Sequence, residues 1–171
     1  MARRALTYAT VVAGLLLTGV SAGPASPAGF ALESSCGSVV DKYGMRVGEE
    51  LWIGLPVLEN HADAPITVTG ATAVHPPAGL RVTGFSAYDG SEGTALSADA
   101  AMMRPYENLA LKPIRIPART ATTVYLMVHL RLTRPGSYTV DSFQVAYAKE
   151  GHRYTQTVGC GAELSSLPYE D

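Results

Sequence analysis

The sequence lacks three short motifs that mark well-known classes of enzyme. It has no Gly-x-Ser-x-Gly, no His-Glu-x-x-His and no Cys-x-x-Cys, and it has only two cysteines in 171 residues. Most acidic residues stand apart, as Asp89 and Glu92 do, and the adjoining Glu49 and Glu50 would point to opposite faces of a strand, so no spacing directs two carboxylates at one bond. We therefore expect a protein that is not an enzyme and that carries no cofactor.

Charge is also scarce. Charged residues make up 16% of the chain, with 13 basic and 15 acidic side chains and a net charge of −2. The arginines in the second half are spread among apolar residues, at Arg115, Arg119, Arg131 and Arg134. Binding to nucleic acid needs a concentration of Lys and Arg, so we expect no nucleic acid partner.

The first 22 residues have the pattern of a secretory signal peptide. Arg3 and Arg4 precede an uncharged stretch over residues 5–20, and Val20-Ser21-Ala22 offers small residues at a cleavage site. The Pro- and Ala-rich residues that follow predict a flexible tether over 23–35. We expect a secreted or extracytoplasmic protein that is associated with the cell envelope. It contacts the membrane only if the apolar stretch is retained as an anchor.

The two cysteines, Cys36 and Cys160, lie 124 positions apart. In an oxidising compartment two thiols tend to pair, so we predict a disulfide that ties together one domain over 36–160. In the chain-entropy model, closing a loop of that length contributes about 4 to 5 kcal/mol. The alternative is two unpaired thiols. Residues 161–171 would form a loose tail.

Alternation of apolar and polar residues, punctuated by Gly and Pro, predicts an all-β fold. The clearest strand is 122–132, in which Val124, Leu126 and Val128 face inward while Met127 and His129 face outward. A slip in the alternation at Asp141-Ser142 of the next strand predicts a bulge. With the other short runs we expect seven or eight strands in a single antiparallel, immunoglobulin-like sandwich, at 39–45, 50–58, 66–74, 80–87, 114–116, 122–132, 138–148 and 153–160.

One connection, residues 89–112, is long for a β-sandwich, and within it only 98–109 resembles a helix. Long loops in compact domains are usually functional or disordered. In one interpretation this connection is an ordered crossover that plugs the open end of the sandwich. In the other it is a recognition loop, and together with Trp52 it presents Met102, Met103 and Tyr106 to a partner.

The histidines and methionines suggest a second function. Met127 and His129 share a strand face, and imidazole with thioether favours copper. Met102 or Met103 and His75 would complete the ligand set. In this respect the chain resembles small periplasmic copper chaperones, which carry a His, a loop Met and a His-x-Met pair. The pair is reversed here, as Met127-Val128-His129. The alternative is that these are ordinary surface residues of a sheet.

Several longer stretches carry a broader resemblance. They are Leu51-Trp52-Ile53-Gly54-Leu55-Pro56-Val57, Ile116-Pro117-Ala118, Pro135-Gly136-Ser137-Tyr138-Thr139-Val140 and Tyr154-Thr155-Gln156-Thr157-Val158-Gly159-Cys160. In these the chain resembles uncharacterised secreted immunoglobulin-like β-sandwich proteins of Streptomyces-like actinobacteria. The resemblance implies a fold but no activity. We expect a non-enzymatic module that binds an extracellular or envelope protein, or another envelope component, with an extracytoplasmic copper-binding protein as the alternative.

Overall fold

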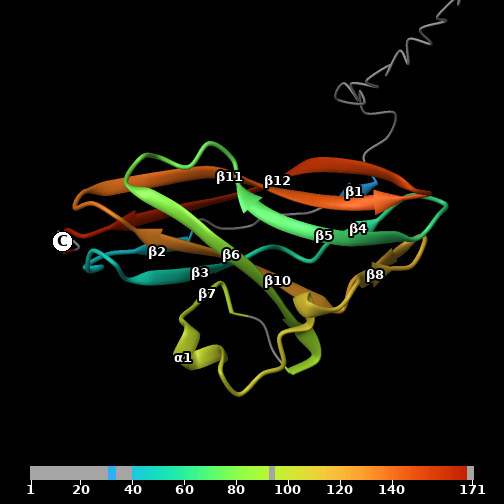
Figure 1. Cartoon of the computed structure of the whole chain (residues 1–171), viewed down its shortest axis with the longest axis horizontal. Coiled ribbons are helices and arrows are strands. Elements are labelled where there is room, and N and C mark those ends of the chain that lie inside the picture. The colour runs from blue at the N-terminus through green and yellow to red at the C-terminus, as the bar shows by residue number, and fades with distance from the viewer. Residues whose placement is uncertain (1–30, 34–39, 93–94, 169–171) are drawn as a thin grey trace, which may run out of the picture.

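The computed structural model shows an all-β sandwich and describes residues 31–33, 40–92 and 95–168 (Figure 1). The strands are β1 (Leu32–Glu33), β2 (Val40–Lys42), β3 (Glu50–Gly54), β4 (Glu59–Asn60), β5 (Ile66–Ala73), β6 (Leu80–Asp89), β7 (Ser97–Ala98), β8 (Ile114–Ile116), β9 (Thr120–Ala121), β10 (Val124–Leu132), β11 (Ser137–Lys149) and β12 (His152–Ser165). The helical segments are α1 (Ala100–Met103) and two 3-10 turns, η1 (Gly90–Glu92) and η2 (Leu109–Leu111). The predicted all-β sandwich is confirmed.

The strand order is that of an immunoglobulin-like fold. One sheet has the order β6-β10-β3-β7, the opposing sheet has the order β2-β12-β11-β5-β8, and a small sheet joins β1, β4 and β9. Strands β3, β10 and β6 take the places of B, E and D, while β12, β11 and β5 take those of G, F and C. At the start of β11 the Tyr138 hydroxyl donates to the carbonyl of Pro135 at 2.9 Å, which is the geometry of a tyrosine corner.

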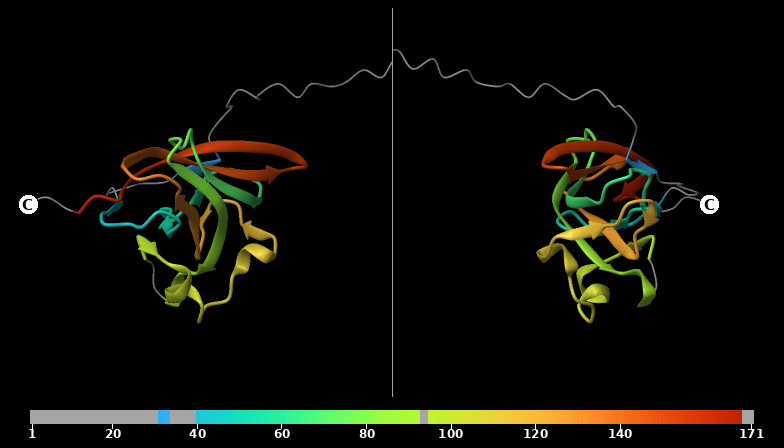
Figure 2. Two further views of the ribbon diagram at one scale, coloured as in Figure 1. Left: turned by 60° about the vertical axis from the view of Figure 1, so that its left-hand side comes forward. Right: turned by 90° about the vertical axis from the view of Figure 1, so that its right-hand side faces the viewer.

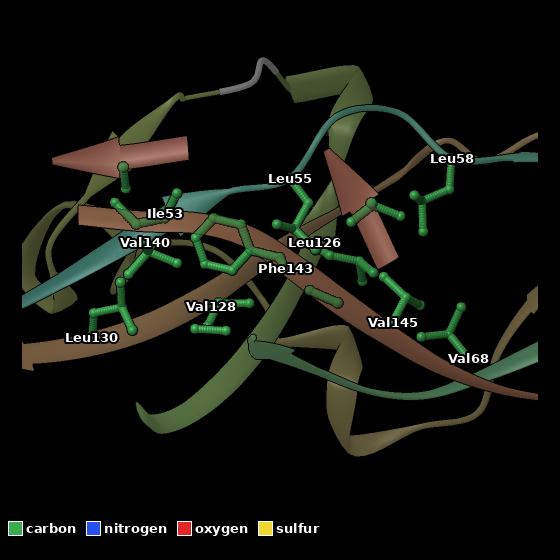
Figure 3. Packing of buried hydrophobic residues seen from close by; sticks show 14 of the residues in the cluster. Ile53, Leu55, Leu58, Val68, Leu126, Val128, Leu130, Val140, Phe143 and Val145 are labelled. Carbon is green, nitrogen blue, oxygen red and sulfur yellow. The ribbon is translucent and has the colours of Figure 1, made fainter. Parts of the chain in front are cut away.

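The core lies between the two larger sheets, and Phe143 is at its centre (Figure 3). Because side chains alternate along a strand, β10 turns Leu126, Val128 and Leu130 towards Phe143 and Val145 of β11. All five side chains are buried. This arrangement confirms the inward face that the alternation predicts for β10.

The β11–β12 hairpin has two features that its sequence accounts for. The β11–β12 register shifts between Val140 and Ser142, which confirms the bulge predicted at Asp141-Ser142. The β11–β12 hairpin turns at Glu150 and Gly151, with φ of 50° and 81°, as a tight two-residue connection requires.

The predicted strand 50–58 is shorter in the structure and ends at Gly54. Pro56 follows and has no N–H to donate to a ladder, so the chain leaves the sheet there. It pairs again as β4 in the small sheet. Val57 therefore does not share the buried position of Leu55, and its side chain is 51% exposed.

The folded part extends beyond the expected limits at both ends. Leu32 lies in the predicted tether, yet it is buried, and the Gln156 side chain both accepts from its N–H at 3.1 Å and donates to its carbonyl. In the predicted loose tail, Ala162 and Leu164 are buried and pair with β11 and β2. Residues 31–33 and 161–165 therefore belong to the sandwich.

Several predictions concern residues outside the described part of the chain. The signal peptide over 1–22 and Cys36 lie outside it, as does the side chain of Cys160. The disulfide and the signal peptide stay predictions. Within the described residues, no helix has the length and apolar character needed to span a membrane.

Candidate functional site

The connection over residues 89–112 crosses from the four-stranded sheet to β8 in the five-stranded sheet. It projects from one side of the sandwich in all three views (Figures 1 and 2). The helix expected over 98–109 is reduced to α1, which is capped by Asp99. The Asp99 carboxylate accepts from the N–H groups of Ala101 and Met102 at 2.8 and 2.9 Å. Its described residues form a crossover, as one of the two interpretations expected, but Met103 packs on a cluster outside the main core and does not plug the end of the sandwich.

The middle of this connection is attached to the edge of the four-stranded sheet, beside β3. Ser97 and Ala98 form β7, which pairs with Ile53 and Trp52 of β3. The N–H of Gly54 donates to the carbonyl of Leu96 at 2.9 Å. The hydroxyl of Tyr125 donates to the carbonyl of Ala95, and burial raises the pKa of this phenol to about 12, which keeps it a donor.

Aromatic rings form a row from the connection across the sheet. Tyr106 meets Tyr88 edge-on with ring centroids 6.5 Å apart, and Tyr88 lies 6.4 Å from Trp52. Trp52 in turn stacks on His129 at 3.9 Å with a 5° angle between the planes. Tyr106 is 42% exposed, whereas Tyr88 is buried beneath it. We call Tyr106, Tyr88, Trp52 and His129 the aromatic row.

The methionines of this region differ in their exposure. Met127 does lie on the outer face of β10, as expected, but it is fully buried in a small cluster with Tyr88, Ala98 and Tyr125. Met103 is partly buried against this cluster. Met102, its neighbour in α1, is 58% exposed. The first half of β10 is thus buried on both faces, because Tyr125 and Met127 on its outer side are covered, whereas Arg131 near its end stays exposed.

Glu50 lies at the centre of a polar network beside the aromatic row. Its carboxylate accepts from Trp52 Nε1 at 2.9 Å, from Thr83 Oγ1 at 2.7 Å and from Arg131 Nη2 at 2.9 Å. Burial alone would raise the pKa of Glu50, but these hydrogen bonds and the charge of Arg131 lower it below its usual value. The network fixes the edge of the Trp52 ring.

His129 is enclosed by the same strands. Its Nε2 is 2.8 Å from Ser86 Oγ, and its Nδ1 is 4.0 Å from Glu50 Oε1. Burial lowers the pKa of His129, and the Glu50 charge raises it part of the way back. The imidazole is therefore neutral over most of the physiological range.

Ser86, His129 and Glu50 lie in the order of a hydrolase triad, but the geometry does not suit catalysis. Ser86 is fully buried, so a substrate does not reach its hydroxyl in this arrangement. The Glu50 oxygens already accept hydrogen bonds from Trp52, Thr83 and Arg131, and the nearest one is too far from Nδ1 for a hydrogen bond. The three groups act as a packed polar network.

The copper ligand set is only partly assembled. Met103 and Met127 meet beside Trp52, but both nitrogens of His129 face polar neighbours. His75 lies before the start of β6. The first residue of β6 pairs with Leu132 of β10, and at 3.3 Å per residue Leu132 is roughly 10 Å along the strand from His129. Within the described residues no three His, Cys, Asp or Glu side chains are grouped to hold a metal. The copper alternative stays a prediction that these contacts do not support.

The predicted partner surface is largely brought together. Trp52 and Met103 pack on one cluster, and Tyr106 joins Trp52 through Tyr88. Sequence reasoning missed Tyr88, because the strand predicted over 80–87 continues to Asp89. It also missed the polar network around Glu50, whose partners come from separate strands and leave no local pattern.

A pocket of about 250 Å³ opens near the point where the connection leaves β6. Its lining is Val57, Gly90, Ser91, Thr122, Thr123, Val124 and Tyr125. No charged side chain lines it, so it offers no partner for an ionic ligand.

Comparison with known proteins identifies no family. No protein-family model matches the sequence, and no curated protein matches it. One solved structure that the fold resembles is titled "Structure of Vibrio cholerae VesB protease", with a TM-score of 0.38 and 13% sequence identity over 79% of this chain. The match spans 32% of that chain. A similarity of this size says nothing about activity.

Proposed function

We propose that this chain is an exported, non-enzymatic β-sandwich module that binds a protein partner of the extracellular space or cell envelope. The observation that carries the proposal is the exposure of Met102 and Tyr106 on a crossover anchored to the sheet. Export rests on the signal-like pattern of residues 1–22.

The exposed pair has the chemistry of a protein-binding surface. Tyr and Met are enriched at the centre of protein interfaces, where they bury a large apolar area. Tyr106 also presents a hydroxyl at the end of a ring whose edge-on contact with Tyr88 limits its freedom. A side chain that is already held loses less entropy when it binds.

The support beneath the pair is rigid. Tyr88 packs against Trp52, and Trp52 is fixed by stacking on His129 and by its hydrogen bond to Glu50. Binding loops on β-sandwiches are commonly held in this way by the sheet that carries them. The aromatic row thus connects the exposed ring to the centre of the sheet.

The first prediction concerns this surface. Replacing both Met102 and Tyr106 by alanine should leave the fold unchanged and reduce capture of the partner at least about tenfold, because central interface residues often contribute more than 1 kcal/mol each. The measurement is an affinity capture with the immobilised chain from culture supernatant and from envelope extract, quantified by mass spectrometry.

Val47→Ala is the matched control. Val47 is 54% exposed, close to the exposure of Met102, and it lies in the turn between β2 and β3. This variant should capture the partner as the wild type does. Equal capture by the double variant, or no protein retained specifically by the wild type, would reject the proposal.

A further inference from the structure

His129 lies on β10, inside the four-stranded sheet, and β3 separates it from β7 of the crossover. It pairs with Trp52 of β3 on one side and Gly84 of β6 on the other. Its ring stacks on Trp52, and only 14% of its side chain is exposed. The buried Ser86 hydroxyl is 2.8 Å from Nε2. A titratable group is thus held in a contact from which water is largely excluded.

The hydrogen-bond pattern favours the neutral ring. A neutral imidazole has one donor and one acceptor nitrogen, whereas the protonated ring has two donors. Glu50 near Nδ1 favours the proton there and leaves Nε2 to accept from Ser86. Protonation of Nε2 takes this acceptor away from the Ser86 hydroxyl, and an unsatisfied buried donor costs free energy.

The surrounding charges do not offset this cost. Glu50 on β3 attracts the protonated ring, but Arg131 on β10 donates to Glu50 and weakens that attraction. Arg81 on β6 is paired with Arg131 and adds positive charge on the same side. From the crossover, Asp99 uses its carboxylate at the start of α1, and Tyr88 on β6 contributes a ring.

The crossover depends on the Trp52 contact. Its middle is held by the pairing of Ala98 with Trp52, by Met103 on the cluster around Met127, and by the backbone bonds at Leu96. A segment with few anchors opens locally at a lower free energy than the sheet that carries it. The Trp52 side chain packs on the same cluster as Met103, so a change in the His129–Trp52 stack reaches the crossover through this cluster.

We propose that protonation of His129 loosens residues 95–103 from the four-stranded sheet, so that the crossover is held firmly near neutral pH and opens as the pH falls. The device consists of the Trp52–His129 stack, the Ser86 hydroxyl and the pairing of β7 with β3.

The direction follows from proton linkage. The pKa of His129 is lower in the folded chain than its ordinary value of 6.5, so the open state binds the proton more tightly than the closed state. The stabilisation is complete above that ordinary value. It decreases as the pH falls towards the folded value.

The test combines two readouts on the full chain. Trp52 is the single tryptophan, so its fluorescence reports the stack directly, and hydrogen exchange reports residues 95–103. From about pH 7.5 to about pH 5 we expect both signals to change together, and the protection factors should fall up to roughly tenfold for each unit of pKa difference between the states. In His129→Gln, which does not titrate, both should be independent of pH.

His152→Gln removes an exposed histidine at the β11–β12 hairpin and serves as the control, which should keep the wild-type profile. Protection of residues 95–103 that is independent of pH in the wild type would overturn the proposal, as would a dependence that persists in His129→Gln. If that variant does not fold, an NMR titration of the His129 ring in the wild type tests whether His129 is the group that controls the loosening. Its midpoint must coincide with the loosening, and a different midpoint rejects the proposal.

Discussion

Replacing Phe143 by alanine should lower the free energy of unfolding by about 4 kcal/mol. Phe143 is fully buried at the centre of the sandwich, where β11 faces Leu126 and Val128 of β10 (Figure 3). The backbones of the two sheets relax only partly when the ring is removed, so a cavity remains. The free-energy cost of this cavity adds to the transfer free energy lost with the ring. Urea denaturation followed by circular dichroism measures the change.

Phe85→Ala is the matched control for this substitution. Phe85 is also on a strand of the sandwich but is only partly buried against the core, so the same chemical change removes less buried area. We expect it to cost less than half as much as Phe143→Ala. Equal losses for the two variants would show that Phe143 does not occupy the centre of the packing.

Alternation along the chain predicted the parts of the fold in which one strand face is buried. β10 keeps a period of two from Val124 to Leu132, and the bulge near Asp141 appears as a break in the same period. Such patterns are local, because the pleat places successive side chains on opposite faces and the apolar residues mark the face that is buried. The sheet order does not follow from them, although turn positions and strand number restrict it.

The ends of the domain could not be predicted from composition. Leu32 follows a Pro- and Ala-rich stretch, and its burial depends on Gln156, which is 124 positions away. Ala162 and Leu164 are too few to define a period on their own. Their burial becomes visible only with the β11–β12 register.

The candidate site was predicted by residue type and not by arrangement. Met102, Met103 and Tyr106 stood out because they lie in a connection that is long for a β-sandwich, and Trp52 because it is a large aromatic residue on a predicted strand. The network that holds them joins Glu50 to Thr83 and Arg131 across 33 and 81 positions. The burial of Met127 likewise depends on a crossover that covers its side of β10. The sequence pattern of one strand does not show whether a distant segment of the chain buries its outer face.

The position of the crossover also explains why residue 54 is a glycine, which the sequence alone does not. Gly54, at the end of β3, has no Cβ, and this permits Tyr125 and Ala95 to lie directly over its backbone. Its N–H donates to Leu96 and its strand partner is Met127. The attachment of the crossover therefore requires a glycine at this position.

Gly54→Ala should lower the free energy of unfolding by about 3 kcal/mol, at the upper end of the range for overpacking. A Cβ at this position would overlap the phenol of Tyr125 and the carbonyl oxygen of Ala95, and backbone cannot move aside cheaply. The hydrogen bond between these two groups and the one from Gly54 to Leu96 would both be strained. Urea denaturation gives the global change, and hydrogen exchange of residues 95–98 shows whether the crossover detaches first.

Gly70→Ala separates this overlap from the general effect of adding a methyl group to a strand. Gly70 lies within β5, and a Cβ there would meet only the Ala146 Cβ at 3.9 Å, an ordinary contact. Removing a glycine at a compatible position restricts the unfolded chain, so this variant should match the wild type or exceed it by up to about 1 kcal/mol. If Gly54→Ala were as stable as Gly70→Ala, the crossover would not lie against β3 as the structure places it. If Gly54→Ala lost stability without faster hydrogen exchange at residues 95–98, the added methyl group would disturb β3 and not the attachment of the crossover.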